Sequence, residues 1–352
     1  MQSLAAFFMD FWWLPARRWT KVQHNLNDPA SIQSGTLEVD KMTKPTRRQF
    51  TASVAAGVLC STTAANAVTL KANPIGLGFS LYGMRSLKVV DALRTVKRIG
   101  YDCVELTVTA GWPADTAMLS KGDRRSIADT LKDTSLRLSS LMEHLYAVVD
   151  DKKHTFNLDR IKVAGELAHQ LSPTRPPVIE TVLGGRSSEW EATKHKIVDR
   201  LHDWAKAAES VRTVIAIKAH VGGAMHLPEH PVWIVEQLKS PWIKCVYDYS
   251  HFKLSDVDMA KSVTTLVPHA AFVHIKDGHR VDGRVQFQLP GEGSVDCAEL
   301  LALISAAGYA GDVVAEVSGQ IHGKPGYDPV ATATKCYNHL SAAFAKAGIK
   351  RA

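Results

Sequence analysis

The feature that most constrains the fold is a regular alternation of short apolar runs with longer helical patterns, from residue 75 to the end of the chain. Runs of this length and residue type indicate buried strands, and the longer segments have the periodicity of amphipathic helices. The strands are expected at 75–82, 103–108, 136–141, 178–183, 213–219, 242–249, 271–275 and 312–317. The helices are expected at 87–99, 123–134, 157–171, 189–210, 231–238, 259–267, 297–307 and 329–347.

Eight strand–helix units in this length of chain fit a (β/α)8 TIM barrel, which usually has about 250 residues. An open doubly wound sheet would carry a glycine-rich phosphate turn after its first strand, and none follows residues 75–82. The sequence therefore predicts an α/β fold in which residues 68–352 form one (β/α)8 barrel.

Residues 1–67 have the features of an export leader. The pair Arg47-Arg48 precedes an apolar, small-residue run at 51–63 and the sequence Ala65-Asn66-Ala67, which has the form of a cleavage site. This order resembles a twin-arginine export signal and predicts an exported, periplasmic protein. Because such a signal belongs at an N-terminus, Met42 is a candidate start. The apolar run is too short for a membrane span, so we expect no stable span in the mature chain.

Charge and cysteine content exclude several partners and cofactors. The net charge is +7, of which the leader supplies +3, and no basic block is interleaved with aromatic residues. We therefore expect no nucleic-acid surface. After the leader, the cysteines are Cys103, Cys245, Cys297 and Cys336, all in apolar patterns without C-x-x-C spacing. Buried free thiols are expected rather than disulfides or a zinc site.

Polar side chains gather where the predicted strands end, which is where barrel enzymes carry their chemistry. They are Glu105, Glu143, His144, Glu180, Lys218, His220, Asp248, His251, His274, Lys276, Asp277, Arg280 and Glu316. Some have ordinary structural explanations: Asp248 can cap a helix, and Asp277 with Arg280 can form a loop ion pair. Asp248, His274 and Glu316 end three consecutive strands at the same height.

Two carboxylates and an imidazole in a cup suit a divalent cation such as Mn²⁺, Mg²⁺, Co²⁺ or Zn²⁺. Such an ion can polarise a carbonyl and stabilise an enediolate while a carboxylate moves the neighbouring proton.

Five motifs resemble those of the xylose isomerase-like barrels, also called the sugar phosphate isomerase/epimerase superfamily. This superfamily includes ketose 3-epimerases, inosose dehydratase and hydroxypyruvate isomerase. The motifs are Gly100-Tyr101-Asp102-Cys103-Val104-Glu105-Leu106, Asp248-x-x-His251, His274-Ile275-Lys276-Asp277, Leu289-Pro290-Gly291-Glu292-Gly293-Ser294-Val295-Asp296 and Ala315-Glu316. The resemblance covers residues 75–345 and implies a sugar isomerase or epimerase.

In the ketose epimerases of that superfamily, a Glu, an Asp, a His and a second Glu from strands five to eight hold the metal. The resemblance maps the last three onto Asp248, His274 and Glu316. It also implies that His251 and Arg280 bind the substrate, and we add His220 and Lys276 as candidate substrate-binding residues.

The chain departs from this pattern at strand five, where Lys218 stands in place of the first Glu. Three alternatives follow. Glu180 or His220 completes the metal site, the ammonium of Lys218 replaces the metal, or a neutral Lys218 forms a Schiff base with a keto sugar. A protonated lysine cannot bind a cation, and nearby carboxylates favour its charged form.

The sequence therefore predicts an exported enzyme that removes a proton next to a carbonyl of a sugar or keto sugar. Glu316 is the preferred base, and Lys218 and Glu180 are further catalytic candidates. The alternatives are β-elimination from a keto sugar, as in a dehydratase, and a sugar-binding barrel without catalysis. The expected partner is a small sugar, and a homo-oligomer is compatible with the sequence.

Overall fold

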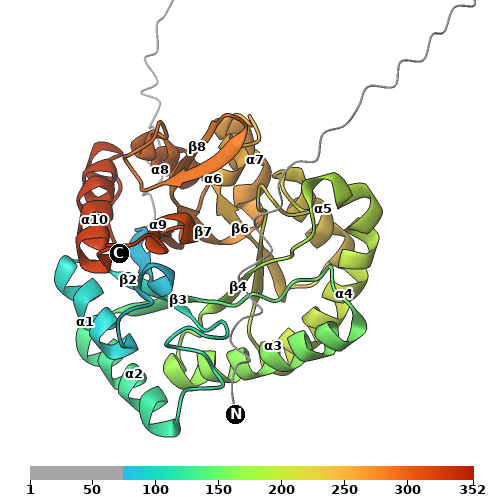
Figure 1. Cartoon of the computed structure of the whole chain (residues 1–352), viewed down its shortest axis with the longest axis horizontal. Coiled ribbons are helices and arrows are strands. Elements are labelled where there is room, and N and C mark those ends of the chain that lie inside the picture. Colours follow the sequence, from blue (N-terminus) through green and yellow to red (C-terminus); the bar gives the residue numbers. More distant parts are fainter. Residues whose placement is uncertain (1–73) are drawn as a thin grey trace, which may run out of the picture. The chain divides into compact units, whose positions relative to one another are not determined.

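The computed structural model describes residues 74–352, and these form a closed barrel of parallel strands surrounded by helices (Figure 1). The barrel strands are β1 (Gly76–Ser80), β2 (Cys103–Thr107), β3 (Arg137–Met142), β4 (Val178–Val182), β5 (Ile215–Lys218), β6 (Ile243–Asp248), β7 (Ala270–Ile275) and β10 (Asp312–Ala315). Their order around the barrel is β1-β10-β7-β6-β5-β4-β3-β2. The predicted (β/α)8 fold is confirmed, whereas the predicted leader lies outside the described residues.

The predicted helices are all present, with bounds close to those expected from the periodicity. They are α1 (Val89–Ile99), α2 (Lys121–Thr134), α3 (Asp151–Leu171), α4 (Trp190–Ser210), α5 (Glu229–Leu238), α7 (Met259–Leu266), α8 (Cys297–Ala306) and α10 (Pro329–Lys346). Helix α3 begins earlier than predicted because the side chain of Asp150 accepts a hydrogen bond from the backbone of Lys153 and caps it. Helix α10 packs beside α1 and closes the ring (Figure 1).

The barrel interior has a small apolar layer that supports the site. Cys103, Ala216, Val246, Phe272 and Val314 form a buried cluster that is separate from the core between strands and helices. A side chain at Gly78 would not fit there, because its Cβ would lie 2.6 Å from Cys103 Sγ and 2.8 Å from Val314 Cγ2. The cluster fills the lower part of the barrel.

The polar residues of the site form the next layer above this cluster, because side chains on one face of a strand recur at every second residue. Side chains two residues apart share one face, and each apolar residue of the layer is followed two positions later by a polar one. The polar residues are Glu105, Lys218, Asp248, His274 and Glu316, and Glu180 follows Val178 in the same way. The alternation therefore places these side chains inside the carboxyl end of the barrel.

Three short elements follow strands at this end of the barrel and were not predicted. They are the 3-10 helix η2 (Leu81–Met84) after β1, α6 (Tyr249–Lys253) after β6 and α9 (Gly319–His322) after β10. Two further 3-10 turns are η3 (Ser187–Glu189) and η4 (Val267–His269).

An antiparallel hairpin, β8 (Asp277–Val281) with β9 (Arg284–Gln288), follows β7 and was also not predicted. Its turn is Asp282-Gly283, with positive φ angles of 48° and 76°. An Asp-Gly pair between two short strands is a strong signal for a β-hairpin, so the sequence alone could have predicted this hairpin.

The four cysteines in the described part of the chain are buried and free, as predicted. Within residues 74–352, no helix is long and apolar enough to cross a membrane.

Candidate functional site

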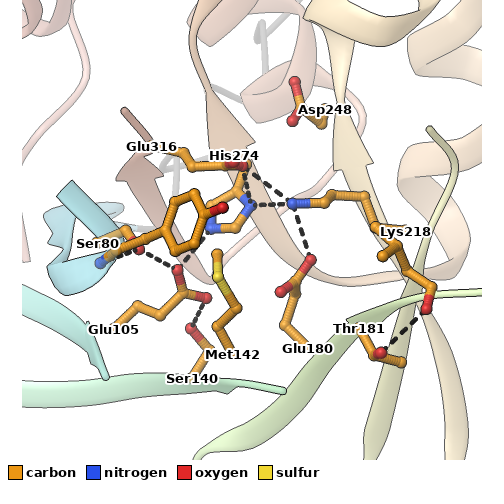
Figure 2. A network of polar contacts seen from close by, with 12 residues as sticks. Ser80, Glu105, Ser140, Met142, Glu180, Thr181, Lys218, Asp248, His274 and Glu316 are labelled. Atoms are coloured by element: carbon orange, nitrogen blue, oxygen red, sulfur yellow. Dashed lines mark hydrogen bonds and ion pairs between the residues drawn. The ribbon is translucent and has the colours of Figure 1, made fainter. Parts of the chain in front are cut away.

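Lys218 is the centre of the polar cluster at the carboxyl end of the barrel (Figure 2). Its Nζ lies 2.9 Å from Glu180 Oε1, 3.0 Å from Glu316 Oε2 and 3.1 Å from His274 Nδ1. The side chain is 4% exposed. Burial alone would lower the pKa of this amine, but Glu180, Glu316 and Asp248 raise it well above its ordinary value. Lys218 is therefore an ammonium at neutral pH.

On the side away from Lys218, the imidazole of His274 pairs with a buried carboxylate. His274 Nε2 is 3.0 Å from Glu105 Oε2, and Glu105 also accepts hydrogen bonds from the hydroxyls of Ser80 and Ser140 (Figure 2). Burial opposes the charge on His274, but Glu105 and Glu316 outweigh it and raise its pKa to about 9. Glu105 thus pairs with a neighbouring basic group and holds the imidazole charged, with one proton directed at each carboxylate. His274 Nδ1 and the Lys218 ammonium are then both donors, and they share Glu316 Oε2 as acceptor rather than bond to each other.

Lys276 is a second cationic side chain in the cluster. Its Nζ forms ion pairs with Asp248 Oδ2 and with Glu316 Oε2, the latter at 2.9 Å. Asp248 also caps α6, because its Oδ1 accepts hydrogen bonds from the backbone and the hydroxyl of Ser250. The helical turn of α6 brings His251 Nε2 to 3.5 Å from Asp248 Oδ2. Asp248 therefore caps α6 and also contacts Lys276 and His251 in the site.

The two buried glutamates that face Lys218 have opposite proton affinities. Burial raises the pKa of both carboxyl groups, but Glu316 faces Lys218, Lys276 and His274, which together hold its pKa well below the ordinary value. Glu180 is compensated mainly by Lys218, and its pKa stays raised. Its Oε1 is at ion-pair distance from Lys218 but makes no hydrogen bond within the described residues. Glu180 is therefore the more basic of the two.

A divalent metal was among the predictions, and three of the predicted ligands converge. One donor atom from each of Asp248, His274 and Glu316 lies within 4.8 Å of the others. The same atoms, however, hold amino groups: Lys218 Nζ is within 3.1 Å of His274 Nδ1 and Glu316 Oε2, and Lys276 pairs with Asp248. A charged imidazole has no lone pair for a metal. The donor types suit a divalent cation, so the convergence supports a possible metal site, although Lys218 Nζ lies against two of these donors in the described arrangement.

The substrate-binding candidates divide into two groups. His251 is buried and His220 half-buried, with ring centroids 4.2 Å apart. Burial, followed by the charge of Lys276, lowers the pKa of His220 to about 4 and that of His251 well below its ordinary range. Both rings are neutral beside the cluster.

Arg280 lies apart from the cluster. It is exposed on β8, and its guanidinium donates to the carbonyls of Leu254 and Gly283 at 2.9 and 3.1 Å. The β8–β9 hairpin, which was not predicted, carries Arg280 beyond the end of β7. A role for Arg280 in substrate binding stays a prediction.

The hairpin also brings a residue to the site that the sequence analysis did not select. The ring of Phe287 on β9 lies 5.3 Å from that of His251 and 5.4 Å from Lys276 Nζ. Gln320 on α9 binds the backbone of Phe287 through its side-chain oxygen at 3.0 Å. The signal that could have found Phe287 is the Asp282-Gly283 turn.

Comparison with known structures identifies similar barrels at low sequence identity. 3-Keto-D-glucoside 4-epimerase YcjR from E. coli matches with a TM-score of 0.62 and 14% identity, over 76% of this chain and 99% of that one. The probable 3-DHS dehydratase AsbF from Bacillus anthracis matches with a TM-score of 0.62 and 15% identity, over 76% and 99%. Two further similar barrels were solved with magnesium and with zinc.

A longer protein also matches. It is a fusion of a xylose isomerase-like TIM barrel with 4-hydroxyphenylpyruvate dioxygenase, and the TM-score is 0.65 at 17% identity. The match covers 78% of this chain but only 43% of the fusion protein. A comparison with curated proteins gives no match.

A family model provides the assignment that these structural matches alone do not. The model described as "Xylose isomerase-like TIM barrel" matches residues 93–335, more than half of the chain. The match includes the strand ends that carry Glu105, Glu180, Lys218, His274 and Glu316. The chain therefore belongs to the xylose isomerase-like TIM barrel family.

Proposed function

We propose that this protein is an enzyme that removes a proton from the carbon next to a carbonyl of a keto sugar, as an isomerase or epimerase does. The observation that carries the proposal is the buried ammonium of Lys218 between Glu180, Glu316 and His274 at the carboxyl end of the barrel. Similar barrels include an epimerase and a probable dehydratase, which supports enzymatic activity of this kind.

The cluster supplies both parts of such a proton transfer. When the C–H bond breaks, its electron pair moves onto the carbonyl oxygen, and the resulting enediolate oxygen needs a positive partner. Lys218 and Lys276 provide fixed positive groups in a buried site. The proton passes to the carboxylate of Glu180, whose pKa is raised by burial and which is therefore a stronger base than Glu316. Return of the proton to the neighbouring carbon, together with transfer of the hydroxyl proton from that carbon's oxygen to the other enediolate oxygen, gives isomerisation.

Glu316 was the preferred base in the sequence analysis, and the electrostatics favour a different role. Its carboxylate accepts from both lysines and from His274, and its low pKa makes it a weak base. We assign Glu316 to holding the two ammonium groups in place. A neutral Lys218 for Schiff-base chemistry is also disfavoured, because the surrounding carboxylates raise its pKa.

Two alternative functions are each supported by a specific observation. Loss of a β-hydroxyl from the enediolate would make the enzyme a dehydratase, and a probable dehydratase is among the similar barrels. A divalent metal on Asp248, His274 and Glu316, with Glu180, requires Lys218 to leave these donors. If bound, the ion would polarise the substrate carbonyl.

The first test is exchange of substrate C–H hydrogen in D₂O, followed by proton NMR over a panel of ketohexoses and keto-glucosides. Wild type is expected to exchange one hydrogen next to the carbonyl. The Glu180→Gln variant is expected to lose about 10²–10⁴-fold in rate, the usual contribution of a general base. Glu236→Gln, an exposed glutamate on α5, is the matched control. Sugar binding without exchange would identify a non-catalytic barrel.

Elemental analysis of the same preparations separates the two sources of positive charge. Wild type is expected to contain less than one metal ion per chain, and Lys218→Glu is expected to gain one, because the added carboxylate replaces the ammonium among the donors. A full metal complement in wild type that is lost in Asp248→Ala would instead support the metal alternative.

We also propose that the protein is exported, on the evidence of Arg47-Arg48 and the run that follows. Changing both arginines to lysine is expected to retain the chain in the cytoplasm with its leader intact. The matched control changes Arg17 and Arg18, a second arginine pair in the leader, in the same way. Cell fractionation with N-terminal sequencing distinguishes the outcomes, and equal export of both variants would contradict the proposal.

A further inference from the structure

The ring of Phe287 on β9 lies against the second ammonium group of the site. Lys276 Nζ is over this ring at 5.4 Å from its centroid, and the ring of His251 meets it edge-on at 5.3 Å. A cation within about 6 Å of an aromatic centroid is attracted to the face of the ring. The Lys276 side chain is 2% exposed, and its Nζ pairs with Glu316 Oε2 at 2.9 Å. Phe287 therefore touches the cluster through a charged group that the proposed proton transfer uses.

The hairpin leaves room for this ring next to α6. Phe287 pairs across the hairpin with Gly278, and paired residues direct their side chains to the same face. A Cβ at Gly278 would lie 3.3 Å from Phe287 Cδ1 and 3.2 Å from Leu254 Cδ1, so a side chain there would press on the ring. Arg280 donates to the carbonyl of Leu254 at 2.9 Å and ties β8 to the end of α6. The ring thus occupies space that the glycine leaves open.

Gln320 on α9 fastens the outer strand of the hairpin. Its side-chain oxygen accepts from the backbone N–H of Phe287 at 3.0 Å, and its side-chain nitrogen donates to the carbonyl of Val285 at 3.1 Å. One amide therefore pairs with two backbone groups on the same edge of β9, as a neighbouring strand would. Gln320 follows Glu316 along the chain, and Glu316 is a carboxylate partner of Lys276. The same segment thus holds the ammonium from one side and the ring over it from the other.

We infer that Gln320 and Phe287 are positioning residues for the proposed proton transfer: Gln320 holds the ring of Phe287 over Lys276, and the ring keeps that ammonium in place for the enediolate oxygen. The inference rests on the proposed function for the role of Lys276. A charged group that is already oriented does not have to reorganise when negative charge develops in the substrate. The plainer alternative is that Gln320 only ties the hairpin to α9.

The first test measures kcat and KM for C–H exchange of D-fructose and of methyl 3-keto-glucoside in D₂O. Gln320→Ala and Phe287→Ala are each expected to lower kcat about 10- to 100-fold, the cost of a small misplacement at a reacting centre. KM is expected to change little, because the ammonium acts on charge that develops only in the transition state. Gln320→Glu keeps the acceptor for the N–H of Phe287 and is expected to retain most of kcat. Gln237→Ala, an exposed glutamine on α5, is the matched control.

The second test detects the contact between the ring and the ammonium without any substrate. In protein labelled with ¹³C at the lysine Cε atoms, the Cε protons of Lys276 are expected at higher field than those of exposed lysines, because an aromatic ring shields protons above its face. Phe287→Ala assigns this signal by removing the shift. Gln320→Ala is expected to move the signal towards the position of exposed lysines, and Gln320→Glu is expected to leave it shifted.

The two readouts together separate a positioning role from a structural tie. Loss of kcat and of the shifted Lys276 signal in Gln320→Ala, with both retained in Gln320→Glu, supports the inference. An unchanged signal in Gln320→Ala, equal losses in Gln320→Ala and Gln320→Glu, a change in KM alone, or wild-type kcat in either alanine variant overturns it and leaves the proposed function intact. Gln320 is exposed, so these variants are expected to fold, and urea unfolding checks this.

The Lys276 signal also separates failure of the inference from failure of the proposed function. If wild type exchanges hydrogen in neither sugar nor in the rest of the panel, the proposed function fails, and with it the catalytic part of the inference. A shifted Lys276 signal that is lost in Gln320→Ala would then still support the part in which Gln320 holds Phe287 over the ammonium. A Lys276 signal at the position of exposed lysines in wild type would overturn that part.

Discussion

Replacing Lys218 by methionine tests the electrostatic centre of the site, because methionine keeps the length of the side chain and removes its charge. Lys218 Nζ lies 3.0 Å from Glu316 Oε2 and 2.9 Å from Glu180 Oε1. At an effective dielectric constant of about 20, one such pair attracts by about 5 kcal/mol. Removal of one partner of a buried ion pair costs about 3–5 kcal/mol, because the other charge is left uncompensated. We expect a loss of this size in the free energy of unfolding at pH 7.

The expected loss in the free energy of unfolding changes with pH, and the pKa shifts determine the direction of this change. The raised pKa of Lys218 contributes stability below about 10.5, its value in the unfolded chain, and this is lost as pH rises through the folded value. The lowered pKa of Glu316 contributes stability above 4.5, and this is lost as pH falls through the folded value. The deficit of Lys218→Met is therefore largest between about pH 5 and 10 and shrinks in acid.

Urea unfolding of wild type and variant at pH 7 and over the range below pH 4.5 measures this deficit and its decrease in acid. The control is Lys261→Met, which removes an exposed pair with Glu229 at 3.3 Å, where the side chains are 66% and 49% exposed. Such a pair is worth about 0–1 kcal/mol. If Lys218→Met costs no more than Lys261→Met at pH 7, Lys218 is not a buried ammonium and the reasoning about the site is refuted.

Three further predictions concern single side-chain contacts, two of them around the site and one at the other end of the barrel. Glu105→Gln should lower the pKa of His274 from about 9, since the charge that holds the imidazolium is removed; an unchanged NMR titration would contradict this. Asp277→Asn should cost about 1–3 kcal/mol in urea unfolding, because the buried carboxylate accepts from Lys253 and from the backbone of Val295 and so ties the hairpin to the loop before α8. Arg351→Ala, at a contact before the amino end of β2, removes two hydrogen bonds to the carboxylate of Asp102 at 2.9 Å and one to the carbonyl of Gly100 at 2.6 Å, and should cost about 1–3 kcal/mol by the same measurement.

The barrel could be predicted from the sequence because each strand is a short apolar run between helical patterns. The candidate residues Glu180, Lys218 and His274 could also be selected from the sequence, because each stands near the end of a predicted strand. The hairpin was missed because its strands are polar and exposed, so neither period nor apolarity marks them. The different environments of Glu180 and Glu316 depend on contacts between four strands, which spacing along the chain does not contain.

The stacking of Tyr82 on Trp112 could not be predicted, for a related reason. Tyr82 and Trp112 lie in separate loops, and each alone is an ordinary half-buried aromatic residue. They meet because β1 and β2 are neighbours in the barrel and their loops leave at the same end. A sequence shows that such residues follow strands, but only the closed barrel shows that they stack.

Lys218 changes what the site can do, because it supplies positive charge that does not depend on a bound ion. The buried carboxylates are Glu105, Glu180, Asp248 and Glu316, and the cationic groups among them are Lys218, Lys276 and His274. One negative charge therefore remains in excess when all are ionised. Glu180, whose pKa is raised, is the carboxyl group that most readily takes up a proton to remove it. Protonation of Glu180 therefore balances the charge of the site, and this favours Glu180 as the carboxylate that takes up a proton from the substrate and returns it.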